Sequence, residues 1–227
     1  MTVHEIRIDK SKTLVEEPAT GHNRWHPDIP PVVRCQPGDE VVMETRDALD
    51  GQAGPGVSAD ALAVPNLDVI HPLTGPVYVE GAEPGDLLAV EILGIEPDSY
   101  GFTVQLPGFG FLRDEFPQPF KVDWDIADGW ATSADLPGVR IPGAPFMGTI
   151  GLPPGHELLA TTIAALRESN WRRVTTTHVT TRGNWSEGFM VKGAVSKTRS
   201  QPRQSHHYRI VTTLKSPPRS FDSYHAW

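Results

Sequence analysis

Hydrophobic and polar residues alternate over short distances through most of the chain. The stretch EIRID changes character at every residue, and three short apolar runs are bounded by Gly, Pro, Asp or Glu: EVVMET, DVIHPLTGPVYVEG and DLLAVEIL. A period of two and short apolar runs between turn residues are typical of β-strands. In HELLATTIAALRES (156–169) the apolar residues instead recur at helical spacing. The pattern predicts an all-β fold with a helix near residue 160.

A Pro-Gly-Asp turn precedes two of these predicted strands, in QPGDEVVM and again in EPGDLLAV. Proline presets φ at the second turn position, and glycine supplies the positive φ of the third. The chain holds 21 Gly and 22 Pro among 227 residues, spread in turn-like pairs. Many short strands joined by such turns predict a two-sheet sandwich resembling a jelly-roll.

Charge divides the chain into two parts. Residues 1–160 carry nine basic and twenty-five acidic residues, whereas residues 161–227 carry eleven basic and three acidic ones. We therefore expect a β domain over 1–160 and an irregular, basic, Ser/Thr/Arg-rich segment over 161–227. Three interpretations of that segment stay open: a nucleic-acid-binding tail, a disordered tail, or a reading frame that slipped near residue 160. We favour the frame slip.

Cysteine content and hydropathy indicate the cellular compartment of the protein. Cys35 is the single cysteine, which excludes an internal disulfide framework and fits a reducing cytosol. The charged start MTVHEIRIDKSK does not resemble a signal peptide, and no stretch approaches the roughly 20 apolar residues that span a bilayer. We expect a soluble, cytoplasmic protein without a membrane partner.

Three stretches contain residues capable of chemistry. HNRWHPD brings His22 and Trp25 into a proline-bounded loop, METRDALDGQ places Asp47 after a strand, and HPLTGPVYVEG joins His71 to Glu80. Imidazole with carboxylate is a common set for Zn²⁺ binding or acid–base work. Each residue also has an ordinary structural interpretation: a surface loop with a packed tryptophan, a solvated turn, or a core histidine.

Read together, these stretches resemble the acetamidase/formamidase family. The resemblance rests on HNRWHPDIPPVV, QPGDEVVMETRDALDGQ, HPLTGPVYVEGAEPGDLLAVEIL, PGFGFLRDEFPQPF and GVRIPGAPFMGTIGLPPGHELLA, and covers about residues 22–160. It implies a jelly-roll-like β core and hydrolysis of short linear amides to a carboxylate and ammonia. It also implies a homo-oligomer in the complete family member and assistance by a divalent metal, with Zn²⁺ expected.

The resemblance assigns roles to the candidate residues. His71 is expected to act as a metal ligand or acid–base group, with Asp47 and Glu80 as the nearest catalytic carboxylates. His22 and Trp25 are expected to bind the small amide substrate. A metal-bound water would then attack the amide carbon while the ion polarises the carbonyl.

The resemblance ends at HELLA. Family members are expected to continue with a Gly-Asp-x-His segment followed by Gln-Gly-Asp-Gly-Glu, and no such motif occurs after residue 160. We therefore expect an incomplete fold and a truncated chain with impaired activity. The alternative function is a non-catalytic β-sandwich binding module whose basic tail contacts an acidic partner, with nucleic acid unfavoured. Binding through such a tail would weaken steeply with salt.

Overall fold

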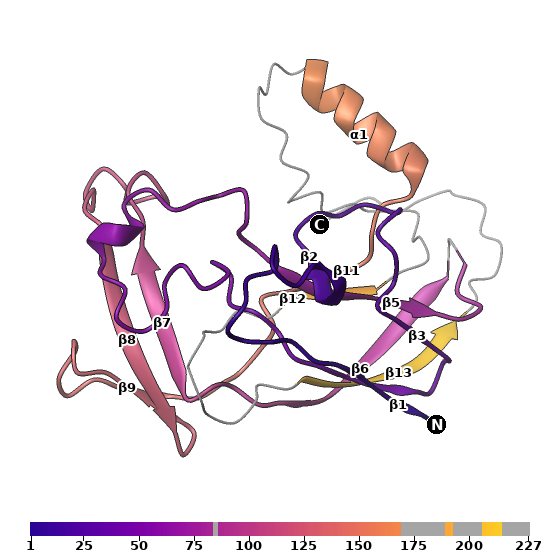
Figure 1. Cartoon of the computed structure of the whole chain (residues 1–227), viewed down its shortest axis with the longest axis horizontal. Helices are drawn as coiled ribbons and strands as arrows, with labels where there is room; N and C mark the ends of the chain where they lie inside the picture. The colour runs from indigo at the N-terminus through magenta and orange to yellow at the C-terminus, as the bar shows by residue number, and fades with distance from the viewer. Residues whose placement is uncertain (84–85, 169–188, 193–205, 215–227) are drawn as a thin grey trace, which may run out of the picture.

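The structure is a computed structural model of the 227-residue chain, and it describes residues 1–83, 86–168, 189–192 and 206–214. Strands and turns make up most of these residues, and helix is scarce (Figure 1). The predicted all-β class is therefore confirmed. The predicted helix is also present, as α1 (His156–Glu168).

The described residues form three β-sheets. The first has the order β1 (Val3–Ile6), β4 (Glu40–Met43), β13 (His206–Leu214) and β6 (Leu87–Ile95). The second has the order β10 (Arg140–Pro142), β9 (Trp130–Thr132), β8 (Phe120–Ala127) and β7 (Tyr100–Gln105). The third has the order β11 (Thr149–Gly151), β12 (Phe189–Lys192), β5 (Leu73–Val79) and β2 (Gly21–His22), and β3 (Val33–Cys35) pairs with β5. Two short 3₁₀ helices, η1 (Pro18–Thr20) and η2 (Asp60–Leu62), lie in loops.

The main core lies between the first and third sheets. It is built from the inward residues of β1, β4, β3 and β5: Ile6, Val41, Met43, Cys35, Val77 and Val79. Burying each large side chain of this kind contributes about 1.5–3 kcal/mol. Burial also raises the pKa of the Cys35 thiol to about 11, so the thiolate nucleophile is not populated at neutral pH.

A second core joins the long loop after β4 to the second sheet. Leu49, Ala53 and Leu62 are buried there, with Phe102 and Val104 of β7 packed against them. This packing fixes the base of the loop on the sheet seen at the left of Figure 1.

The Lys121 side chain reinforces this junction. It is 4% exposed, and its Nζ lies 2.7 Å from the Asp123 carboxylate. The same ammonium group donates to the carbonyls of Gly54 and Val57, at 2.9 and 3.1 Å. All three of its donors are therefore used, as a buried ammonium requires.

Two strands come from the segment expected to be irregular. β12 lies between β11 and β5, and β13 lies between β4 and β6, from His206 opposite Met43 to Leu214 opposite Leu87. The expectation of an irregular segment is wrong at these two places. Sheet pairing is made by backbone N–H and C=O groups, so a strand does not require a regular side-chain period. The expected boundary at residue 160 stays a prediction.

Candidate active site

An open pocket of about 580 Å³ lies beside β2, which pairs with the first residues of β5. Its apolar lining residues are Leu14, Val15, Pro18, Ile29 and Val69, and its polar ones are His22, Asn23, Arg24, His26 and Asp68. Hydrophobic lining with a few convergent polar groups is the usual make-up of a small-molecule site.

Strand pairing fixes the position of His22 in this pocket. Gly21 lies opposite Thr74, and His22 lies opposite Leu73. A Cβ on Gly21 would come within 2.3 Å of the Leu73 carbonyl oxygen, so only glycine allows the two strands to approach this closely.

The His22 imidazole is buried and has no hydrogen-bond partner among the described residues. The residue is 8% exposed, and neither ring nitrogen is hydrogen-bonded within the described part of the chain. Burial lowers the pKa of His22 to about 4, and the nearby backbone of Arg24 offsets part of this shift without meeting hydrogen-bond geometry. The ring is therefore neutral at pH 7 and presents one donor and one acceptor nitrogen.

This buried imidazole makes stability depend on pH. The unfolded chain binds a proton at His22 below pH 6.5, whereas the folded chain does so only below about pH 4. Between these values the unfolded state holds more protons, so the free energy of unfolding falls as pH is lowered, by about 3 kcal/mol in total. We expect urea unfolding between pH 4 and 7 to show this slope, and His22→Leu to remove it.

The matched control is His26→Gln, because the His26 side chain is 44% exposed. That variant should keep the wild-type slope. A slope of unchanged size in His22→Leu would contradict the assignment of this proton to His22.

Trp25 lies next to His22 without lining the pocket itself. The two ring centroids are 6.4 Å apart, in an edge-to-face arrangement. The indole also lies over Gly151 of β11, where a Cβ would come within 2.9 Å of Cη2. Trp25 thus supports the imidazole from one side.

In the sequence, His71 stands between a residue that lines the pocket and the residue that pairs with His22. Val69 lines the pocket, and Leu73 pairs with His22. The His71 backbone has φ +60°, a left-handed conformation that costs non-glycine residues about 1–3 kcal/mol and clusters at functional sites. His71 is half-buried, and its N–H donates to the Ala48 carbonyl at 2.7 Å.

That hydrogen bond ties His71 to the turn that Asp47 organises. The buried Asp47 carboxylate accepts the backbone N–H groups of Leu49 and Gly51, at 2.9 and 2.8 Å. Asp47 therefore holds the turn whose Ala48 carbonyl positions His71. The structure places His71 and Asp47 in one region, where Asp47 uses both carboxylate oxygens within the turn, and the catalytic roles of both residues stay predictions.

Glu80 lies elsewhere. It follows the last residue of β5, whereas His71 precedes the first, so the strand separates them by roughly 25–30 Å at 3.3 Å per residue. The Glu80 carboxylate instead pairs with Arg34 at 2.7 Å, and the Arg34 guanidinium lies 3.7 Å over the Tyr78 ring. The structure does not bring Glu80 to the site of His71, because the extended strand carries its neighbours in sequence apart.

A rim cluster at the pocket joins two segments that are distant in sequence. Asp28 lies 3.1 Å from His156 Nε2 at the start of α1 and 3.8 Å from His26 Nδ1. His26 lines the pocket, so α1 begins at its edge. The sequence carried no signal for this contact, since His156 follows an ordinary Pro-Pro-Gly turn.

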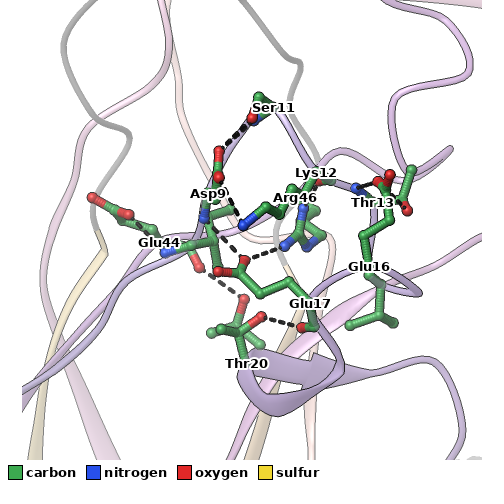
Figure 2. A network of polar contacts seen from close by, with 12 residues as sticks. Asp9, Ser11, Lys12, Thr13, Glu16, Glu17, Thr20, Glu44 and Arg46 are labelled. Carbon is green, nitrogen blue, oxygen red and sulfur yellow. Dashed lines mark hydrogen bonds and ion pairs between the residues drawn. The ribbon is translucent and has the colours of Figure 1, made fainter.

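The apolar wall of the pocket belongs to the loop 9–20, which polar contacts hold in place (Figure 2). Arg46 donates to the Lys12 carbonyl, and its Nη2 lies 2.6 Å from the Glu17 carboxylate. The same Glu17 oxygen accepts the Asp9 N–H at 2.9 Å. Sequence reasoning missed this network, because residues 9–20 contain no motif and their partners follow β4.

Asp50 completes the hold on the wall. Its carboxylate accepts the Leu14 N–H at 2.9 Å, and its backbone has φ +53°. The turn after β4 therefore touches both sides of the site: Arg46 and Asp50 fix the wall, and Asp47 fixes the loop of His71.

The described residues do not form a metal site by themselves. Imidazole nitrogens suit Zn²⁺, and those of His22 have no hydrogen-bond partner among the described residues. Yet no group of three or more His, Cys, Asp or Glu among these residues is arranged to hold an ion. Any metal would need further donors.

The fold and the pocket define an all-β protein with a cavity at the end of a sheet. Comparison with known proteins is more specific. The profile of the acetamidase/formamidase family matches residues 7–207, well beyond the stretch 22–160 that carries the visible resemblance. The chain belongs to the acetamidase/formamidase family.

Curated relatives agree with this assignment. The chain is 40% identical to an acetamidase of Mycolicibacterium smegmatis over an alignment 166 residues long, which covers 67% of this chain and 41% of that protein. It is also 40% identical to a formamidase of Methylophilus methylotrophus over an alignment 162 residues long, which covers 69% of this chain and 40% of that protein. The chain thus spans about two fifths of the length of the curated relatives it matches.

Solved structures share the fold. A gamma lactamase from Delftia acidovorans superposes with a TM-score of 0.75 at 26% identity, covering 92% of this chain and 67% of that one. An acetamidase from Bacillus halodurans superposes with a TM-score of 0.61 at 19% identity, covering 87% and 70% respectively, and this likeness shows the fold alone. No helix in the described part of the chain has the length and hydropathy needed to cross a membrane.

Proposed function

We propose that this protein hydrolyses linear amides to a carboxylate and ammonia, with the substrate bound in the pocket beside His22. One observation carries the proposal: a member of an amidase family presents in a pocket a buried, neutral imidazole that has no hydrogen-bond partner in the described part of the chain. A polar group left unpaired in this way costs about 1–3 kcal/mol, and a polar ligand would remove that cost.

The pKa of His22 decides between two roles. A general base works best with a pKa near the working pH, and the His22 pKa of about 4 is too low for that. A neutral imidazole is well suited to hydrogen-bond a primary amide, which carries both N–H donors and a carbonyl acceptor. His22 is therefore the substrate-binding residue, and Trp25 keeps its ring in place.

His71 is the acid–base group in this proposal. It lies at the same end of β5, in a strained backbone conformation fixed through Ala48 by the turn of Asp47. Hydrolysis requires a proton to leave the attacking water and a proton to reach the departing nitrogen. His71 would carry these protons, and Asp47 would act as its positioning residue, with Glu80 outside the site.

Zn²⁺ assistance, which the sequence resemblance implies, stays a proposal that needs donors beyond the described residues. His71 and His22 are the imidazoles that this chain would offer to it. We likewise propose a jelly-roll-like sandwich, because two of the sheets share one core. The single cysteine supports a cytoplasmic protein. The family resemblance supports a protein that self-associates.

The test is ammonia release by the purified chain from formamide and acetamide, before and after dialysis against a chelator and after addition of ZnCl₂. The proposal expects ammonia in proportion to protein. Loss on chelation and recovery with zinc would support the metal. No ammonia from either amide under any of these conditions would contradict the proposed function, and the non-catalytic binding module would then be favoured.

A further inference from the structure

The pocket beside His22 is larger than the shortest amides require. Its volume of about 580 Å³ falls in the range of sites for ligands much larger than acetamide. Acetamide has four non-hydrogen atoms and fills on the order of 100 Å³, about three times the liquid volume of a water molecule. Most of the pocket would stay empty around it.

The lining is divided by chemistry in a way that suits a longer substrate. His22, Asn23 and Arg24 come from β2 and the residues that follow it, and the loop 9–20 contributes the apolar side chains of Leu14 and Val15. We propose that this pocket takes linear amides whose acyl group carries an apolar chain of about four to six carbons, with the amide at His22 and the chain along the wall formed by Leu14, Val15 and Pro18. The proposal rests on the proposed function, whose site it deepens.

Polar contacts hold the wall in one conformation, as a surface that selects substrates by chain length requires. The Arg46 side chain is 5% exposed and pairs with Glu17. Asp50 accepts the N–H of Leu14, the buried residue of the wall. Ordering the wall before binding removes part of the entropy cost of immobilising it around a ligand. Arg46 is therefore a positioning residue for the wall.

Affinity for a series of amides tests the proposal. Acetamide, butyramide and hexanamide are titrated separately into the ¹⁵N-labelled chain, and dissociation constants are taken from NMR shifts. If the chain lies on the wall, each added methylene should tighten binding about two- to fourfold, the upper value for full burial. Affinity that stays flat or falls from acetamide to hexanamide would overturn the proposal.

Two matched variants locate the effect. Val15→Asp puts a charge on the wall at a residue that is 71% exposed, so it should fold and should remove the gain per methylene. Val64→Asp makes the same change at a residue that is 89% exposed and outside the pocket, and should keep the gain. Equal chain-length dependence in both variants would overturn the placement of the acyl chain.

Arg46 has a graded test. Arg46→Met should reduce the gain per methylene, and Arg46→Lys should restore part of it, because lysine keeps a donor and a charge for Glu17. Circular dichroism melting of both variants reports whether they fold. If folded Arg46→Met retains the full gain, Arg46 does not position the wall.

Failure of this inference differs from failure of the proposed function. Tighter binding of hexanamide without ammonia release would support the pocket and contradict hydrolysis. Ammonia release from formamide with no gain in affinity along the series would support hydrolysis and contradict the long-chain substrate.

Discussion

Replacing His71 with asparagine is expected to lower kcat/KM for ammonia release about 100- to 10,000-fold, the usual worth of a general acid–base group. Asparagine tolerates the left-handed conformation at φ +60° better than most residues do, so the backbone and its hydrogen bond to Ala48 should persist. The loss would then report the missing imidazole. Ammonia release by wild-type and variant chains at equal folded concentration measures it.

Two further variants separate chemistry from strain. His71→Gly removes the imidazole and relieves the backbone, so it should be inactive yet as stable as wild type or up to about 1 kcal/mol more stable. His4→Asn removes a different histidine, one that pairs with Asp39 at 3.1 Å near the N-terminus, and should leave turnover unchanged. Full activity in His71→Asn would remove His71 from the mechanism.

Substituting Gly21 with alanine is expected to have the largest effect on stability, a loss of about 3 kcal/mol or more. The new Cβ would overlap the Leu73 carbonyl oxygen, at 2.3 Å, and that atom belongs to a paired strand that cannot rotate away. β2 would have to leave β5, and His22 would leave the pocket with it. Urea unfolding at pH 7 measures the loss.

Gly94→Ala is the matched control for this change. Gly94 lies in β6, and a Cβ there would meet no atom of the described residues within 4 Å, so its effect should stay within about 0.5 kcal/mol. Equal effects of the two substitutions would mean that β2 and β5 do not approach as closely as the structure has them.

Local patterns predicted the elements well where burial alternates or recurs. EVVMET became β4, DLLAVEIL lies within β6 apart from its first residue, and the apolar spacing of 156–169 became α1. The second sheet was harder to foresee, because β8 reads FKVDWDIA and is half-exposed, so charged residues interrupt its apolar side. β12 and β13 pair through backbone groups, which leave no periodic mark in the sequence.

The sequence offered candidate site residues but not their arrangement, and their roles stay predictions. His22, Trp25, Asp47 and His71 were all singled out, and the structure gathers them around the start of β5. Glu80 shares a motif with His71 but lies beyond the other end of the strand.

Side-chain contacts between segments that are distant in sequence could not be predicted from the sequence, for a physical reason. Asp28 with His156 and Arg46 with Glu17 join residues 128 and 29 positions apart, and neither pair falls in a motif. Such pairs depend on how loops meet after the sheets have formed, and single-sequence patterns report only local structure.

The most direct test of the central claim is a titration of the His22 imidazole itself by ¹⁵N NMR with ring-labelled histidine. Its resonances are assigned by their absence from His22→Leu, and butyramide is added at pH 7. If this pocket binds the amide, the His22 nitrogens shift saturably while those of His4 stay in place, and without ligand they titrate near pH 4. Unmoved His22 resonances in a sample that converts butyramide to ammonia would contradict the account, because the amide would then be bound elsewhere.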